Sequence, residues 1–109
     1  MSAAVDRAKK LVDAGADAIF PEAMASLEDF AAIRAAVDVP ILANMTEFGK
    51  SELFTTQQLA DVGVNIVIFP VSLLRLAMGA AERGLDTLLA EGSLTTKVAE
   101  MQTRARLYE

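Results

Sequence analysis

The 109-residue chain contains no cysteine and no histidine. The absence of cysteine excludes disulfide bonds and thiolate metal ligands, and it makes the cytoplasm the expected compartment. The absence of histidine removes the commonest general base and the commonest metal ligand. Carboxylates are therefore the strongest acid–base groups that the chain can offer near neutral pH.

Positive charge and long apolar runs are also scarce. Ten Lys and Arg residues stand against fifteen Asp and Glu residues, giving a net charge of −5. The scattered cations argue against a nucleic-acid partner. The longest apolar run, around "NIVIFPVSLL", is interrupted by Asn65, Pro70 and Ser72 and falls short of the roughly 20 residues of a membrane span. We therefore expect one small soluble domain with no membrane partner.

Apolar residues recur with a helical period in two early segments. The pattern predicts an amphipathic helix over residues 3–14, which ends at Gly15, a residue suited to a left-handed turn. Ser26 is a candidate N-cap for a second helix, whose inward face would carry Phe30, Ile33 and Val37.

Short apolar runs alternate with these helices. Strands are predicted to begin near Asp17, Pro40 and Asn65, a spacing of about 24 residues. Between the last two strands, Thr55 and Gln58 form a capping box for a short helix that ends at Gly63. Apolar strands separated by helices are typical of a parallel sheet with right-handed crossovers.

The last third of the chain has a different pattern. Residues 73–90 predict a long helix that is apolar around nearly its whole circumference, and such a helix must be buried on more than one side. After Gly92, Ser93 is expected to cap a last helix.

Three parallel strands leave two sheet edges and little core for so many apolar residues. Eight βα units of this period would make roughly 200 residues, the scale of a (β/α)₈ TIM barrel. We therefore interpret the α/β chain as the C-terminal three βα units of such a barrel, followed by a long helix and a terminal helix. The expected domains are residues 1–92, a partial barrel with its last helix, and residues 93–109.

Polar residues are grouped directly after the predicted strands. Glu22 follows "AIFP", while Asn44 and Thr46 follow "ILA" and alternate with Met45, so they share a face. The C-terminal strand ends of a (β/α)₈ barrel bind substrate. Singly, Glu22 could be a solvated loop acid, and Asn44 and Thr46 could cap loop backbone.

The segments "AGADAIFPEAM", "VPILANMTEFGKSELFT" and "VNIVIFPVSLLRLAMGAAERG" resemble the C-terminal part of the 2-methylisocitrate lyase family. That family is a branch of the isocitrate lyase/phosphoenolpyruvate mutase superfamily. The resemblance covers nearly the whole chain, and "NMTEFG" with "LFT" downstream is its most specific signal.

The resemblance implies a carbon–carbon lyase of propionate catabolism that cleaves 2-methylisocitrate to pyruvate and succinate in a Mg²⁺-dependent retro-aldol reaction. Glu22 would orient metal-bound water and substrate, without binding the metal directly. Asn44 and Thr46 would hydrogen-bond a substrate carboxylate, while Phe69 and Pro70 would form a pocket wall. Helix 73–90 would be exchanged with a neighbouring subunit in a homo-oligomer.

The family's magnesium carboxylates and its catalytic cysteine, in a "KKCGH" motif, have no counterpart in this chain. We therefore expect no catalytic residue, no direct metal ligand and no activity in the chain alone. Two alternatives stay open. The chain could belong to another superfamily enzyme, an oxaloacetate hydrolase or a carboxyphosphonoenolpyruvate/phosphonopyruvate-type enzyme, or it could be a non-catalytic assembly module.

Overall fold

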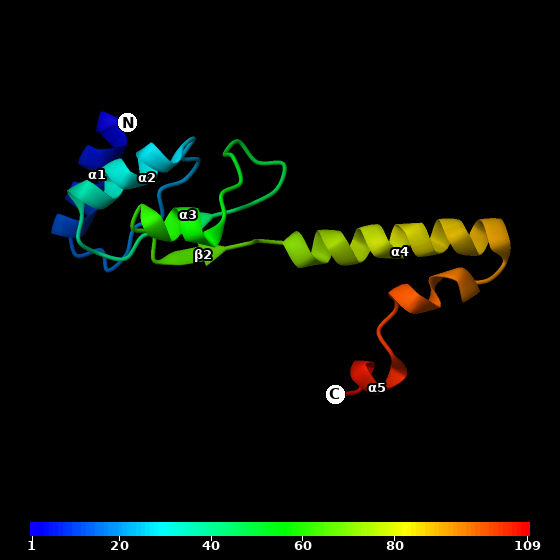
Figure 1. Cartoon of the computed structure of the whole chain (residues 1–109). Helices are drawn as coiled ribbons and strands as arrows, with labels where there is room; N and C mark the ends of the chain where they lie inside the picture. Colours follow the sequence, from blue (N-terminus) through cyan, green and yellow to red (C-terminus); the bar gives the residue numbers. More distant parts are fainter. The chain divides into compact units, whose positions relative to one another are not determined.

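Helices and short strands alternate over the first part of the chain, as the sequence predicts. The computed structural model describes residues 1–109 (Figure 1). The elements in order are α1 (Ser2–Asp13), α2 (Leu27–Ala36), β1 (Leu42–Asn44), α3 (Thr56–Asp61), β2 (Ile66–Ile68), α4 (Ser72–Glu91), a 3₁₀ helix η1 (Thr95–Glu100) and α5 (Arg104–Leu107). Their packing separates two units, residues 1–72 and residues 73–109.

The two strands of the first unit are parallel, which confirms that expectation. Leu42 pairs with Ile66, and Asn44 pairs with Ile68. The first predicted strand is reduced to a single parallel bridge between Ile19 and Ile41. Pro21 follows closely and has no N–H with which to extend the ladder, which explains why this strand is so short.

The predicted N-caps of α2 and α3 are confirmed. The Ser26 hydroxyl accepts from the Asp29 N–H at 3.3 Å and caps α2. A hydrogen bond from its own backbone N–H and a second from Ser26 lower the pKa of the exposed Glu28 carboxyl in the same turn. At α3, the Thr55 hydroxyl accepts from the Gln58 N–H at 3.1 Å, and the Gln58 side chain accepts from the Thr55 N–H at 2.9 Å.

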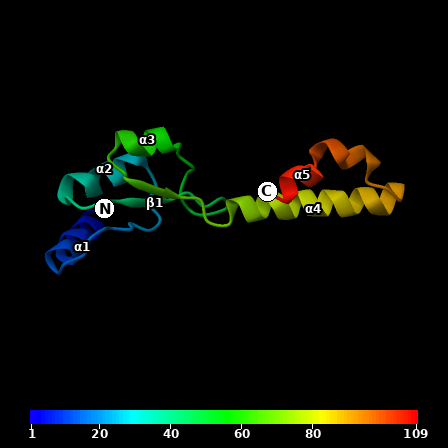
Figure 2. The same cartoon turned by 90° about the horizontal axis from the view of Figure 1, so that it is seen from below.

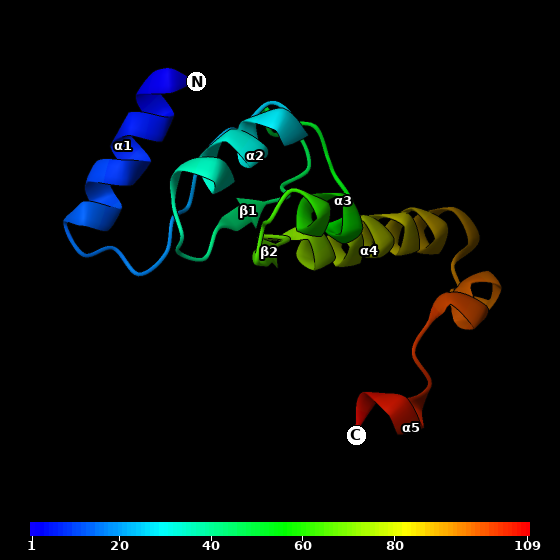
Figure 3. The same ribbon diagram turned by 60° about the vertical axis from the view of Figure 1, so that its left-hand side comes forward.

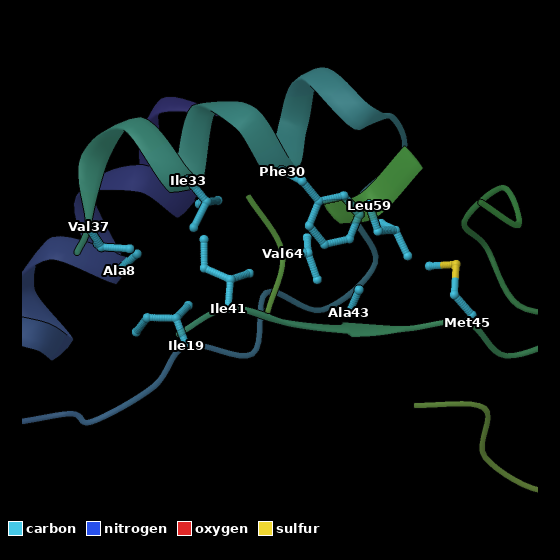
Figure 4. Close-up of a cluster of buried hydrophobic side chains, with 10 residues drawn as sticks. All are labelled: Ala8, Ile19, Phe30, Ile33, Val37, Ile41, Ala43, Met45, Leu59 and Val64. Atoms are coloured by element: carbon cyan, nitrogen blue, oxygen red, sulfur yellow. The ribbon is translucent and has the colours of Figure 1, made fainter. Parts of the chain in front are cut away.

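The core lies between the helices and one face of the sheet. Figures 2 and 3 show α2 next to both α1 and α3. In Figure 4, Phe30 and Ile33 of α2 point toward the strand that carries Ile41 and Ala43. The buried set is Ala8, Ile19, Phe30, Ile33, Val37, Ile41, Ala43, Met45, Leu59 and Val64.

The other face of the same sheet is open. Ile66 is 45% exposed and Ile68 is 37% exposed, although both are apolar and lie within β2. Their partners across the ladder, Leu42 and Asn44, are only half-buried. A parallel sheet is normally covered on both faces, so the first unit has one face that nothing within it covers.

In the second unit, α4 extends one residue beyond each predicted end. None of its residues is buried, so the second unit by itself does not supply the burial that the apolar circumference predicts. No helix of the structure combines the length and the apolar character needed to cross a membrane.

A single last helix over residues 93–109 is not observed. The Ser93 hydroxyl accepts from the Thr95 N–H at 3.1 Å, which gives a tight local turn instead of a helix cap. Met101 is extended after η1, and the Thr103 hydroxyl then caps the separate helix α5.

Candidate functional site

A cavity of about 280 Å³ lies at the C-terminal ends of the strands in the first unit. Glu22, Asn44 and Thr46 all line it, although they come from two separate segments of the chain. The remaining wall includes Met24, from the segment that leads into α2, and Lys50 and Ser51, from the loop after β1. The three polar residues singled out at the strand ends are therefore brought together.

The bridge at Ile19 brings Glu22 to this place. The Ile19 N–H donates to the Pro40 carbonyl at 2.9 Å, and the Leu42 N–H donates to the Ile19 carbonyl at 2.9 Å. These two bonds align residues 19–22 with β1. Ala23 then has a positive φ of 56°, so the chain turns sharply after Glu22 before α2 begins.

Asn44 and Thr46 lie on either side of a buried methionine. Met45 is 1% exposed and packs into the core, whereas its two neighbours line the cavity. The Met45 N–H donates to the Ile68 carbonyl at 2.9 Å, which holds this point of β1 against β2. The Phe54 N–H donates to the Met45 sulfur at 3.3 Å, so the following loop returns to the same side chain.

The cavity contains hydrogen-bonding groups that the chain itself leaves unused. Asn44 Oδ1 is buried and has no hydrogen-bond partner. The Thr46 hydroxyl makes one long contact, 3.5 Å, to the Glu47 carbonyl. Because an unpaired buried acceptor costs free energy, the Asn44 amide is suited to a ligand that supplies the missing partner.

The cavity wall carries both signs of charge. Glu22 supplies a carboxylate, and Lys50 supplies an ammonium group. Lys50 is a lining residue that the sequence patterns above do not single out. The available signal was its position a few residues after a strand that ends in polar residues.

Phe69 and Pro70 are not among the residues that line this cavity. Phe69 is 50% exposed, directly after β2. Ser72, from the same strand end, donates its hydroxyl to the two carboxylate oxygens of Glu47, both at 2.8 Å.

A second, larger and mostly apolar cavity of about 410 Å³ lies between α1 and the segment around Ile19. Ala4, Ala8 and Leu11 of α1 contribute to it, and Arg7 is its one cation. No group of three His, Cys, Asp or Glu side chains in the structure could hold a metal ion.

Comparison with known proteins gives one family. The family model "Phosphoenolpyruvate phosphomutase" matches residues 1–89. All 109 residues align at 55% identity with "Probable 2-methylisocitrate lyase 2" of Corynebacterium glutamicum, and at 46% with "2-methylisocitrate lyase" of Halalkalibacterium halodurans. The chain spans 36% of the length of each of these two relatives.

Among solved structures, that of 2,3-dimethylmalate lyase, a PEP mutase/isocitrate lyase superfamily member, matches with a TM-score of 0.75 and 29% identity, over 87% of this chain and 34% of the lyase chain. The structure of oxaloacetate acetylhydrolase in complex with the product oxalate matches with a TM-score of 0.83 and 30% identity. That match covers 99% of this chain and 37% of the hydrolase chain.

Proposed function

Since the chain belongs to the phosphoenolpyruvate phosphomutase family, we propose that it is part of a carbon–carbon lyase that cleaves 2-methylisocitrate to pyruvate and succinate. The observation that carries this proposal is the identity of 55% and 46%, over the whole chain, to two relatives with 2-methylisocitrate lyase in their names. The match to oxaloacetate acetylhydrolase is lower, at 30%, which favours the lyase over hydrolysis of oxaloacetate.

In this proposal the chain supplies the C-terminal three βα units of a (β/α)₈ barrel. The parallel pairing and the order of the three strand segments support it. The open face at Leu42, Ile66 and Ile68 would be the inward face of the barrel, which the other strands would cover. Residues 1–92 would form the partial barrel with its last helix, and residues 93–109 would form a C-terminal segment.

The cavity at the strand ends would bind part of the substrate. The Asn44 amide and the Thr46 hydroxyl would hydrogen-bond a carboxylate, and hydrogen bonds to charged groups are among the stronger ones. Glu22, which also lines the cavity, would orient water and the reacting part of the substrate. Phe69 and Pro70 would contribute the wall at the end of β2 once the barrel is closed.

The proposal assigns no direct magnesium ligand to the residues of this chain. Mg²⁺ belongs to the proposal for the complete enzyme only, with its ligands supplied outside these residues, and no step of the reaction is derived through it. The complete enzyme would be a homo-oligomer in the cytoplasm that uses helix 73–90 as a contact between subunits.

An activity assay tests the proposal. The purified chain is incubated with 2-methylisocitrate and Mg²⁺, alone and together with the N-terminal two-thirds of the Corynebacterium glutamicum relative, and pyruvate is measured. We expect release of pyruvate only from the mixture, because the chain has no cysteine and no metal cluster. Release by the chain alone would contradict its expected inactivity. A parallel assay of the same mixture contains oxaloacetate in place of 2-methylisocitrate. Faster formation of oxalate there than of pyruvate from 2-methylisocitrate would favour the hydrolase instead.

A further inference from the structure

One side-chain interaction joins the ends of the two strands beyond their last backbone pair. The Glu47 carboxylate, three residues after β1, accepts from the Ser72 hydroxyl, four residues after β2. Both oxygens lie at 2.8 Å from the hydroxyl oxygen, and both residues are half-buried. Twenty-five residues of sequence separate the partners, so this bond closes the whole connection through α3.

The residues next to this pair have unfavourable backbone conformations. Phe48, directly after Glu47, has a φ of 62°, and Val71, directly before Ser72, has a φ of 56°. A positive φ is a genuine outlier for a β-branched residue such as valine. Such conformations persist only where the surrounding structure fixes them, and they are concentrated at functional sites.

Helix α4 adds an electrostatic reason for the pair. Ser72 is its first residue, and its first turn contains no acidic side chain. A carboxylate bound to Ser72 therefore supplies the negative charge that a helix N-terminus favours.

From these observations we propose that Glu47 is a positioning residue. Its bond to Ser72 fixes the left-handed turns at Phe48 and Val71, and thereby holds Asn44 and Thr46 at the wall of the cavity. Glu47 itself does not line that cavity, so it acts through its neighbours and not by contact with a ligand. The role of the cavity in binding substrate rests on the proposed function. The effect of the Glu47–Ser72 hydrogen bond on the backbone does not.

Amide hydrogen exchange in the 109-residue chain, followed by NMR, tests the link directly. The hydrogen-bonded amides next to the link are those of Met45, which donates to the Ile68 carbonyl, and Phe54, which donates to the Met45 sulfur. We expect Ser72→Ala to accelerate exchange at these two amides at least tenfold, because the loop loses its attachment. Ser72→Thr keeps the hydroxyl and should restore slow exchange. Glu52→Gln, which removes an exposed acid from the same loop, is the matched control and should change nothing. Slow exchange at Ile41 and Ala43 verifies that each variant is folded.

Exchange at Met45 and Phe54 in Ser72→Ala that equals the Glu52→Gln control would overturn the proposal. Should Ser72→Ala fail to fold, Glu47→Ala gives the second test, because it removes both acceptor oxygens. Faster exchange is expected at the same two amides, and unchanged exchange would overturn the link.

Kinetics of the reconstituted lyase provide an independent readout. A positioning role predicts a fall in kcat/KM for Ser72→Ala that Ser72→Thr rescues. If the wild-type mixture releases no pyruvate, the proposed function fails, while the exchange data still decide whether Glu47 positions Asn44 and Thr46.

Discussion

At the scale of single residues, Asn65 connects β2 to the neighbouring strand with its side chain. Its Oδ1 accepts from the buried Ile41 N–H at 3.0 Å and lies 3.5 Å from Arg34 Nη1. Asn65→Ala would leave the N–H of Ile41, a core residue with 0% exposure, without its partner. We expect a loss of about 1–3 kcal/mol in the free energy of unfolding, measured by urea denaturation. Asn65→Asp keeps an acceptor and should lose less; equal losses would contradict this account.

Asn44 and Thr46 are the residues whose chemistry can be tested in the reconstituted lyase. Removing either group should raise KM and lower kcat, since each hydrogen bond to a charged partner contributes about 1.5–3 kcal/mol. Asn44→Ala and Thr46→Ala should therefore each reduce kcat/KM by about tenfold or more in a pyruvate-release assay. Ser51→Ala, on the same wall, is a control for general disturbance of the cavity. Wild-type kinetics in both variants would show that these residues only cap the loop.

At the scale of elements, Gly→Ala substitutions at three positions distinguish the cost of a positive φ from the cost of steric overlap with a neighbouring side chain. Gly63 ends α3 with a φ of 86°, and a Cβ there would lie 2.5 Å from Arg34 Cδ. Gly15 has a φ of 103° but open space around it, and Gly84, within α4, has open space and no positive φ. In urea denaturation we expect Gly63→Ala to destabilise most, Gly15→Ala by about 1–2 kcal/mol, and Gly84→Ala to stabilise α4 by up to about 1 kcal/mol. A Gly63→Ala chain as stable as Gly15→Ala would mean that Arg34 moves aside freely.

The helices of the first unit could be predicted closely because their ends depend on local chemistry. Ser26 and the Thr55–Gln58 pair are caps that need only residues three positions away, and both are confirmed. The first strand was overestimated because its length depends on pairing with other strands, which its own residues do not determine. The prediction of one continuous helix over residues 93–109 is wrong. Ser93 and Thr103 each support a local turn that competes with a longer helix.

The site was predictable in part for the same reason. Parallel strands bring their carboxyl ends to one edge, so the proximity of Glu22 to Asn44 follows from topology alone. The contribution of Lys50 and the Glu47–Ser72 bond depend on how loops fold back, with positive φ at Phe48 and Val71. No periodic pattern encodes such conformations, and neither Phe nor Val signals them.

At the scale of the whole molecule, the chain exposes more apolar side chain than a stable monomer normally does. The sheet leaves Ile66 and Ile68 uncovered, and the exposed residues of α4 include Leu73, Leu76 and Leu89, at 80%, 69% and 86%. Large exposed apolar patches mark sites of association between proteins. The same surface is what the proposed barrel and subunit contacts would cover.

Helix α4 carries a regular apolar stripe that suits a second copy of the chain. Leu74, Met78, Ala81, Leu85 and Leu88 follow one another at alternating steps of four and three residues. This spacing is the seam along which helices pack in coiled coils and bundles. Leu74, Met78 and Leu85 are 58%, 55% and 60% exposed, so the second unit by itself leaves the stripe uncovered.

We therefore expect the 109-residue chain to form an oligomer at micromolar concentration, measured by light scattering. Leu85→Lys places a charge in the middle of the stripe and should shift the chain toward monomer, because burying a leucine contributes about 1.5–3 kcal/mol and an unpaired charge opposes burial. Leu53→Lys, at a comparably exposed leucine in the loop before α3, is the matched control and should leave the mass unchanged. A wild-type chain that is monomeric and unfolds in one cooperative transition would mean that α4 covers its stripe with residues of its own chain. The interpretation as part of a barrel would then have to be revised.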